Sequence, residues 1–186
     1  MLNVYGAPST RQGGHEMAYD LLTRAYEQVA GSPLPPIDRT ETGKPYFVRN
    51  ALEFSLTHTK TMAFCALSSH VVGIDAETVR PVLPRVLERT MNPAELAWID
   101  EQPDRDRAFL QLWTAKEAWV KLTGTGLQGC PKSVVLQFRD GQIGVENTHV
   151  HFYSREIDGV LVTVCAPLAE TVTWQMVQPD GGVHTI

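Results

Sequence analysis

The sequence of 186 residues lacks long hydrophobic runs and contains few cysteines. No apolar stretch approaches the roughly 18 residues that a membrane-spanning helix needs. The first residues also lack the basic start and the apolar stretch of a secretory signal. The cysteines are odd in number and have no metal-site spacing, which predicts reduced thiols at Cys65, Cys130 and Cys165. These absences predict a cytoplasmic protein without a membrane segment.

Positive charge is also scarce. The chain has 16 Lys and Arg residues against 21 Asp and Glu residues, which gives a net charge of −5. This balance gives no support to nucleic-acid binding, so any basic surface for an acidic partner must be local. A chain of this length forms one domain of ordinary size or two small lobes that share a core.

The spacing of apolar residues predicts a sheet, then helices, then a second sheet. A helix is expected over residues 15–30, and a longer one from near Arg105 to Gly124, which permits a left-handed cap. Asn92-Pro93-Ala94-Glu95 is typical of a helix start with a capping box. Strands are expected at 2–6, 52–57, 61–67, 71–77, 133–138, 148–154, 160–168 and 171–177. This order predicts an α+β fold without regular strand–helix alternation.

One weak repeat suggests two similar lobes. The tetrapeptides FCAL at 64–67 and VCAP at 164–167 lie 100 residues apart, and each precedes a β-like run. Two shared residues prove nothing, and on these residues alone chance is the better explanation. If the repeat is real, Gln175 and Val177 correspond to Asp75 and Glu77. Only one lobe then keeps a pair of carboxylates at this position.

That acidic pair is Asp75 and Glu77, in the predicted strand VVGIDAE. Side chains two apart in a strand point to the same face, so the two carboxylates converge. Converging carboxylates repel each other unless a cation lies between them, and hard oxygen ligands favour Mg²⁺. The alternative is a solvated strand end with both acids facing water.

The long helix carries charges inside an apolar sequence. Trp113, Glu117 and Lys121 are spaced four apart and share one face. A third carboxylate beside lysines suits a metal flanked by a phosphate chain. Lys116 lies about 100° from Glu117 around the helix, and it could meet phosphate or protein from the adjoining side. The alternative is a Glu–Lys surface pair, worth only about 0.2–0.5 kcal/mol.

Three further polar residues are candidate anion ligands. His58 and Thr57 lie at the end of a predicted strand, where they could hydrogen-bond a phosphate oxygen. Lys44 lies in a predicted turn and could supply a point charge. The alternatives are a structural histidine and a solvated lysine. The other five histidines have no ligand spacing and are expected to be structural: His15, His70, His149, His151 and His184.

Four segments in this order resemble the 4′-phosphopantetheinyl transferase superfamily, in its monomeric two-lobed (Sfp-type) branch. They are GKPYF, FSLTHT, VVGIDAE and WTAKEAWVKLTGTGL, which lie between residues 43 and 127. The resemblance implies two α+β lobes, 1–78 and 79–186, packed as a pseudo-dimer with the active site between them. Each lobe is expected to have a small antiparallel sheet and a long helix.

The resemblance also implies a reaction. Family members transfer the phosphopantetheine arm of coenzyme A to a serine of an acyl- or peptidyl-carrier protein and release adenosine 3′,5′-bisphosphate. The carrier could serve fatty-acid, polyketide or nonribosomal-peptide synthesis. Two alternatives stay open: a degenerate relative that binds a carrier or coenzyme A without turnover, and a Mg²⁺-dependent diphosphate hydrolase.

Residue roles follow from the matched motifs. The implied Mg²⁺ ligands are Asp75, Glu77 and Glu117. The implied catalytic residues are Glu117 as general base, Lys121 and Lys116. The implied coenzyme A ligands are Lys44, Thr57, His58 and Lys121.

Two features outside these motifs bear on the partners. Arg11 is the only cation before the first expected helix, so another cation, such as Arg24 or Arg39, is an open candidate for a remaining coenzyme phosphate. Carrier proteins of this kind are acidic around their serine, which predicts a basic or apolar docking groove. Such a groove is expected near Arg85, Arg89 and Met91.

Overall fold

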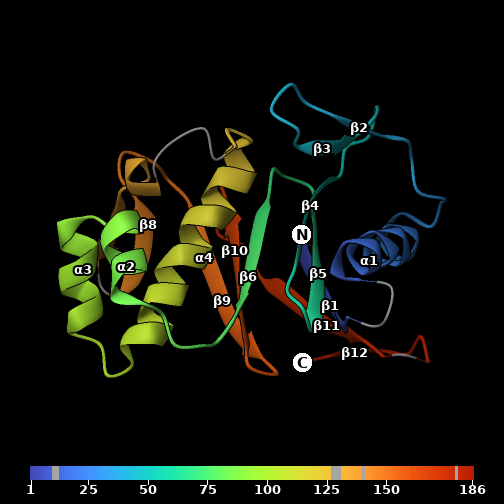
Figure 1. Ribbon diagram of the computed structural model, residues 1–186. Coiled ribbons are helices and arrows are strands. Elements are labelled where there is room, and N and C mark those ends of the chain that lie inside the picture. The colour runs from blue at the N-terminus through green and yellow to red at the C-terminus, as the bar shows by residue number, and fades with distance from the viewer. Residues whose placement is uncertain (10–12, 127–130, 140, 179) are drawn as a thin grey trace.

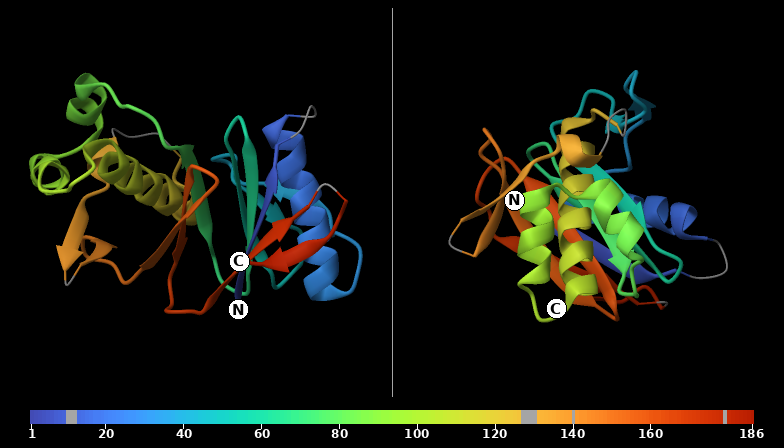
Figure 2. Two further views of the ribbon diagram at one scale, coloured as in Figure 1. Left: turned by 90° about the horizontal axis from the view of Figure 1, so that it is seen from below. Right: turned by 60° about the vertical axis from the view of Figure 1, so that its left-hand side comes forward.

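The computed structural model describes residues 1–9, 13–126, 131–139, 141–178 and 180–186. Its elements form four layers (Figure 1): one helix, a five-stranded sheet, a three-stranded sheet, and a layer of helices. The helices are α1 (Gly14–Ala30), α2 (Pro84–Thr90), α3 (Pro93–Asp100) and α4 (Arg105–Thr123). Helix α1 covers the outer face of the larger sheet, and α4 covers the smaller one. Figure 2 shows the two sheets between these helices.

The larger sheet has the order β12-β11-β1-β5-β4, and the smaller has the order β6-β10-β9. In the larger sheet only β1 and β11 are parallel neighbours, and the other pairs are antiparallel. The strands are β1 (Leu2–Pro8), β4 (Glu53–His58), β5 (Met62–Ser68), β6 (Gly73–Thr78), β9 (His151–Ile157), β10 (Val160–Ala166), β11 (Val172–Val177) and β12 (Val183–Thr185). Two separate hairpins pair β2 (Ile37–Arg39) with β3 (Pro45–Phe47), and β7 (Leu136–Arg139) with β8 (Gln142–Val145).

The hydrophobic core is divided by the sheets. Strand β5 is buried on both faces, because it lies inside its sheet and both faces are covered. Phe64 and Ala66 pack against the other sheet, whereas Cys65 and Leu67 pack against α1. A third cluster fills the space between the smaller sheet and helices α2 to α4. The predicted strands at 61–67 and 160–168 therefore correspond to the interior strands β5 and β10.

The same succession of elements occurs twice in the chain. Each lobe has a strand, a long helix, a hairpin and two more strands, and the second lobe has α2 and α3 inserted before its long helix. The three strands outside the hairpin lie in the order β1-β5-β4 in the first lobe and β6-β10-β9 in the second. The repeated tetrapeptides at 64–67 and 164–167 lie in or directly after the corresponding strands β5 and β10. Strands β11 and β12 return to the first sheet. The predicted lobe boundary between residues 78 and 79 stays a prediction. In the structure the strands of the second repeat begin with β6, which ends at residue 78 and so lies before that boundary.

The expected α+β class is confirmed, and so are the main helix boundaries. Asn92 accepts from the backbone N–H of Glu95, whose side chain accepts in return, so the capping box is present. Gly124 ends α4 in the left-handed conformation, with φ 68°. Helix α2 was not anticipated, because seven residues are too few to show a period. The strand expected from residue 133 begins at Leu136, after a short 3₁₀ turn.

Two of the cysteines lie in buried strand interiors as free thiols, Cys65 and Cys165. Cys130 lies outside the described residues, as does Arg11. Within the described part of the chain, no helix is both long and apolar enough to cross a bilayer.

Candidate active site

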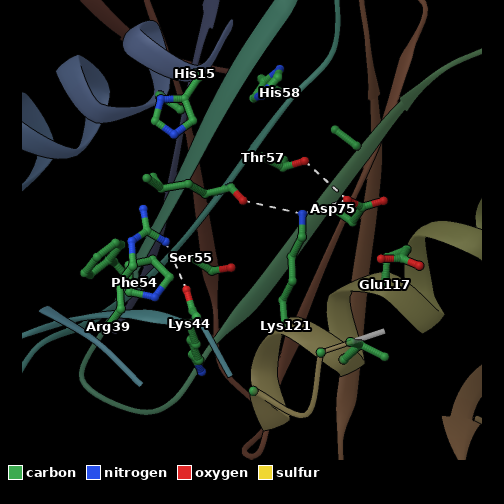
Figure 3. A pocket seen from close by; sticks show the side chains of 18 of the residues that line it. His15, Arg39, Lys44, Phe54, Ser55, Thr57, His58, Asp75, Glu117 and Lys121 are labelled. Atoms are coloured by element: carbon green, nitrogen blue, oxygen red, sulfur yellow. Dashed lines mark hydrogen bonds and ion pairs between the residues drawn. The ribbon is translucent and has the colours of Figure 1, made fainter. Parts of the chain in front are cut away.

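A pocket of about 530 Å³ lies where the two lobes meet. Its walls come from the ends of β4 and β6, the second half of α4, the start of α1 and the turn between β2 and β3. Figure 3 shows Asp75, Glu117 and Lys121 on β6 and α4, and Lys44, Arg39 and His15 on the elements of the first lobe. The pocket therefore needs side chains from both repeats of the chain.

Helix α4 lies unusually close to β6. A Cβ atom added at Gly73 would lie 1.9 Å from the carbonyl oxygen of Ala118 and 2.6 Å from the backbone nitrogen of Leu122. Only glycine permits this approach. Because Ile74 and Ala76 pack into the core between the sheets, Asp75 and Glu77 lie on the opposite face of β6, toward the helix. The close approach brings α4 to these two carboxylates.

Lys121 joins the ends of β4 and β6. Its Nζ donates to Oδ1 of Asp75 at 2.8 Å, to the carbonyl of Ile74 at 3.0 Å and to the carbonyl of Leu56 at 3.4 Å. The hydroxyl of Thr57 donates to the same Oδ1 at 3.3 Å. One ammonium group thus bridges the two lobes and pairs with the buried carboxylate.

The carboxylates have raised pKa values. Burial, and then the negative charges of Asp75 and Glu77, raise the pKa of Glu117 to about 7, although Lys121 opposes the shift. Burial also raises the pKa of Asp75, against the effect of Lys121. Burial and the charge of Asp75 raise the pKa of Glu77, whose nearest cation is Arg80 at 3.5 Å. The three acids are therefore close enough to affect one another, and a cation among them would relieve the repulsion.

The donor chemistry fits a divalent cation. Three carboxylates facing one pocket supply the hard oxygen ligands that Mg²⁺ prefers. As they stand, however, the described residues contain no three His, Cys, Asp or Glu side chains gathered closely enough to hold a metal ion. The ammonium of Lys121 lies against Asp75 and supplies the positive charge there. The three residues that would hold an ion are Asp75, Glu77 and Glu117.

All the other predicted site residues except Lys116 also line the pocket. Thr57, His58 and Lys44 all line it. The ring of His58 packs against the first residue of α1, where a Cβ on Gly14 would lie 2.5 Å from Nδ1. Lys44 donates from Nζ to the carbonyl of Leu122 at 2.7 Å, so it also satisfies the end of α4. Burial lowers the pKa of Lys44.

Lys116 is the exception, because it does not line this pocket. Its side chain is buried, and Nζ lies 2.7 Å from Oε2 of Glu95, whose side chain is fully buried. It also donates to the carbonyls of Thr90 and Pro131. Lys116 thus holds α3, the end of α2 and the start of the 3₁₀ turn at Pro131 against α4. Its catalytic role stays a prediction without support from this geometry.

The structure adds one histidine to the site that the sequence analysis did not assign to it, and it places one of the two open arginine candidates in the pocket. His15, expected to be structural, lines the pocket beside Tyr19, and Arg39 lines it from β2. No local pattern marks them, because they reach the pocket only through the packing of α1 and of the β2–β3 hairpin on the sheet. Met91, expected in a docking groove, is fully buried, whereas Arg85 and Arg89 are exposed on α2.

Comparison with known proteins gives consistent matches. The sequence profile of the 4′-phosphopantetheinyl transferase superfamily matches residues 71–165, which is more than half of the chain. The 4′-phosphopantetheinyl transferase gsp of Aneurinibacillus migulanus is 33% identical over 58% of this chain and 47% of its own length. The 4′-phosphopantetheinyl transferase Sfp of Bacillus subtilis is 31% identical over 61% of this chain and 54% of its own. The chain spans about half the length of these relatives.

A solved structure of lower similarity is the holo-[acyl-carrier-protein] synthase (AcpS) of Thermotoga maritima. The alignment has a TM-score of 0.43 and 24% identity, and it covers 50% of this chain and 60% of that one.

Proposed function

The chain belongs to the 4′-phosphopantetheinyl transferase superfamily, and on that premise we propose that it transfers 4′-phosphopantetheine from coenzyme A to a serine of an acyl- or peptidyl-carrier protein. The observation that carries the proposal is the pocket shared by the two lobes, which combines three carboxylates with Lys121. Since both of its walls come from one chain, a monomer would suffice.

In this reaction the serine hydroxyl attacks the phosphorus atom next to the pantetheine. A new bond from the serine oxygen to phosphorus forms, and the phosphorus–oxygen bond to the other phosphate breaks. Adenosine 3′,5′-bisphosphate leaves with the bonding pair. The hydroxyl proton must go to a base, and Glu117 suits this role because its carboxylate faces the pocket from α4 beside the two acids of β6.

The cationic residues would bind the donor's phosphates. Lys121 presents an ammonium in the pocket that contacts both lobes and pairs with Asp75. When the donor binds, this ammonium would move from Asp75 to the diphosphate. The coenzyme would also contact Thr57 and His58 at the end of β4, and Lys44 in the turn between β2 and β3, since all three line the pocket. Catalysis of this kind depends chiefly on positioning and on neutralising charge.

Mg²⁺ would be held by Asp75, Glu77 and Glu117, and when bound it would supply positive charge to the diphosphate and to the leaving group. The protein's own part is to gather the carboxylates on β6 and α4. The close packing at Gly73 accounts for this gathering.

Mass spectrometry of apo carrier proteins tests the proposal. A panel of purified apo carriers is incubated with the protein, coenzyme A and Mg²⁺. We expect one or more carriers to gain the phosphopantetheine mass, and the gain to disappear when EDTA replaces Mg²⁺. Release of adenosine 3′,5′-bisphosphate without a carrier would instead indicate a diphosphate hydrolase. Binding of coenzyme A without any product would indicate a degenerate relative.

A further inference from the structure

The ammonium of Lys121 is surrounded by oxygen atoms in the way that a bound cation would be. Its Nζ has three acceptors: Oδ1 of Asp75 at 2.8 Å, the carbonyl of Ile74 at 3.0 Å and the carbonyl of Leu56 at 3.4 Å. An ammonium group has three N–H donors, so these acceptors match all of them. Lys121 is thus a tethered positive charge that the chain itself places on the carboxylate of Asp75.

The carboxylate of Asp75 is a strong binding partner because it is buried. The residue is only 8% exposed, and the hydroxyl of Thr57 donates to the same Oδ1 at 3.3 Å. A buried carboxylate is costly unless a cation pairs with it, and the salt bridge with Lys121 supplies that cation. The ammonium therefore stabilises the fold as well as facing the pocket.

The same carboxylate is one of the three that would hold Mg²⁺ in the proposed reaction. Glu117 also faces the pocket, and Lys121 follows it by one turn of α4. Two cations that share one carboxylate repel each other unless an anion lies between them. The ammonium on Asp75 therefore opposes the binding of a divalent cation at this site.

The pocket allows the ammonium to change partners. The side chain of Lys121 is 32% exposed, against 12% for that of Asp75, so a ligand in the pocket can reach the ammonium. The long stem of a lysine also lets its donors turn toward a new acceptor. A diphosphate in the pocket would accept these hydrogen bonds or lie between the two cations. Either arrangement would relieve the repulsion at Asp75.

We propose that Lys121 acts as an internal counter-ion for Asp75, so that the site binds a divalent cation weakly until a diphosphate engages the lysine. Metal and donor then bind with positive coupling, which acts equally in both directions. The part of this inference that concerns the diphosphate rests on the proposed function, whereas the competition between the ammonium and a metal ion does not. The competition has a definite sign: removal of the charge of Lys121 should strengthen metal binding.

Binding of Mn²⁺, followed by the EPR signal of the free ion, tests the competition in the full chain without a donor or a carrier. Mn²⁺ suits the same carboxylate ligands as Mg²⁺. Lys121→Gln should bind Mn²⁺ about 10- to 100-fold more tightly than the wild type, as expected for the loss of one charged contact. Lys44→Gln is the matched control, because it removes the same charge from the same pocket, but Lys44 binds the carbonyl of Leu122 and not Asp75. Its affinity for Mn²⁺ should stay close to that of the wild type.

A second titration, with coenzyme A present, tests the coupling. Direct contact between Mn²⁺ and the diphosphate raises the affinity for Mn²⁺ in both the wild type and Lys121→Gln. The wild type should gain more, because its donor also draws the ammonium away from Asp75. An equal gain in both proteins would overturn the coupling.

The outcomes separate this inference from the proposed function. An affinity for Mn²⁺ that is unchanged or lower in Lys121→Gln would overturn the counter-ion, and so would an equal increase in Lys44→Gln. If Lys121→Gln is poorly stable without a metal, thermal unfolding gives the second measurement: Mn²⁺ should raise its unfolding temperature by more than it raises that of the wild type. A tighter Mn²⁺ site in Lys121→Gln, in a protein that modifies no carrier, would support the counter-ion and overturn the transferase.

Discussion

At the scale of single residues, Glu117 combines a raised pKa with a position on the pocket face of α4. Glu117→Gln keeps the size of the side chain but removes its charge and its ability to take a proton. We expect the transfer rate to fall by about 100- to 10,000-fold, as for loss of a general base. Circular dichroism should match that of the wild type, and the unfolding temperature should not fall, because the variant removes a buried charge whose ionisation is unfavourable in the fold.

Glu27→Gln provides the matched control, since Glu27 is exposed on α1 and does not line the pocket. Its transfer rate should equal that of the wild type. Normal transfer by Glu117→Gln would remove Glu117 from the mechanism, and an equal loss in Glu27→Gln would mean that the assay reports a general defect.

The same residue predicts a pH dependence of stability in the metal-free protein. The pKa of Glu117 rises from its usual 4.5 to about 7 in the folded state. Between these values the folded chain holds a proton that the unfolded chain has released, so the free energy of unfolding falls as the pH rises through this range. Urea titrations in EDTA at about pH 5 and about pH 7.5 measure the change. Glu117→Gln should reduce it, and an identical pH dependence in both proteins would contradict the shift.

Sequence patterns could place the acidic residues of the site and Lys121, but they could not place His15 or decide between Arg39 and Arg24. Asp75 and Glu77 alternate in a strand, and Glu117 and Lys121 repeat at helical spacing, so a local period places each pair on one face. Arg39 and His15 belong to no such period. They enter the pocket because a hairpin and a helix pack onto the sheet, and that packing depends on contacts far apart in the chain.

At the scale of elements, the contact between α4 and β6 fixes the distance between the carboxylates. Gly73→Ala would place a methyl group 1.9 Å from the carbonyl oxygen of Ala118, so the helix has to move away. We expect a loss of about 1–3 kcal/mol or more in the free energy of unfolding, as for overpacked cores. The transfer rate of the folded variant should also fall, because Glu117 and Lys121 move with the helix.

The control for this variant is Gly144→Ala in β8. A Cβ there meets no atom within 4 Å, so the change should be nearly neutral in urea unfolding. If Gly73→Ala matched Gly144→Ala in both stability and rate, the close contact would not be what positions the site.

A helix or strand could be predicted wherever its pattern of apolar residues extended over enough residues to show a period. The period of α1 and the cap of α4 were both visible in the sequence, whereas the three-residue strands β2 and β12 and the seven-residue helix α2 were not. Lys116 shows a second limit. Its place in the helix was evident, but its burial against Glu95 depends on how α3 packs, so the sequence suggested a ligand where the structure has an internal ion pair.

At the scale of the whole molecule, the two lobes contribute different kinds of side chain to the pocket. The first lobe supplies His58, Lys44 and Arg39, and the second supplies the acids of β6 and α4. Direct contacts join them: the hydroxyl of Ser55 accepts from the backbone N–H of Ile74 at 3.1 Å, in addition to the bridge made by Lys121. A donor bound between the lobes would therefore contact both repeats at once.

The predicted docking groove for a carrier protein falls on the outer surface of the second lobe, at α2. Arg85, Glu88 and Arg89 are exposed on α2. Val86 on the helix and Leu83 directly before it are 37% and 56% exposed. A basic and apolar surface of this kind suits an acidic carrier, and it lies at the opposite end of the molecule from α1 (Figure 2). The buried Met91 supports α2 from inside and takes no part in this surface.

Arg85→Glu tests this docking surface. Reversal of one charge at the rim should raise the KM for an acidic carrier by about tenfold at low salt and by less at high salt, with little effect on kcat or on coenzyme A binding. Arg24→Glu is the matched control, because it makes the same change of charge on α1, far from α2. Steady-state rates with several carriers measure the difference. An equal effect of both substitutions would point to the net charge of the protein, and unchanged KM values in Arg85→Glu would place the carrier on another face of the second lobe.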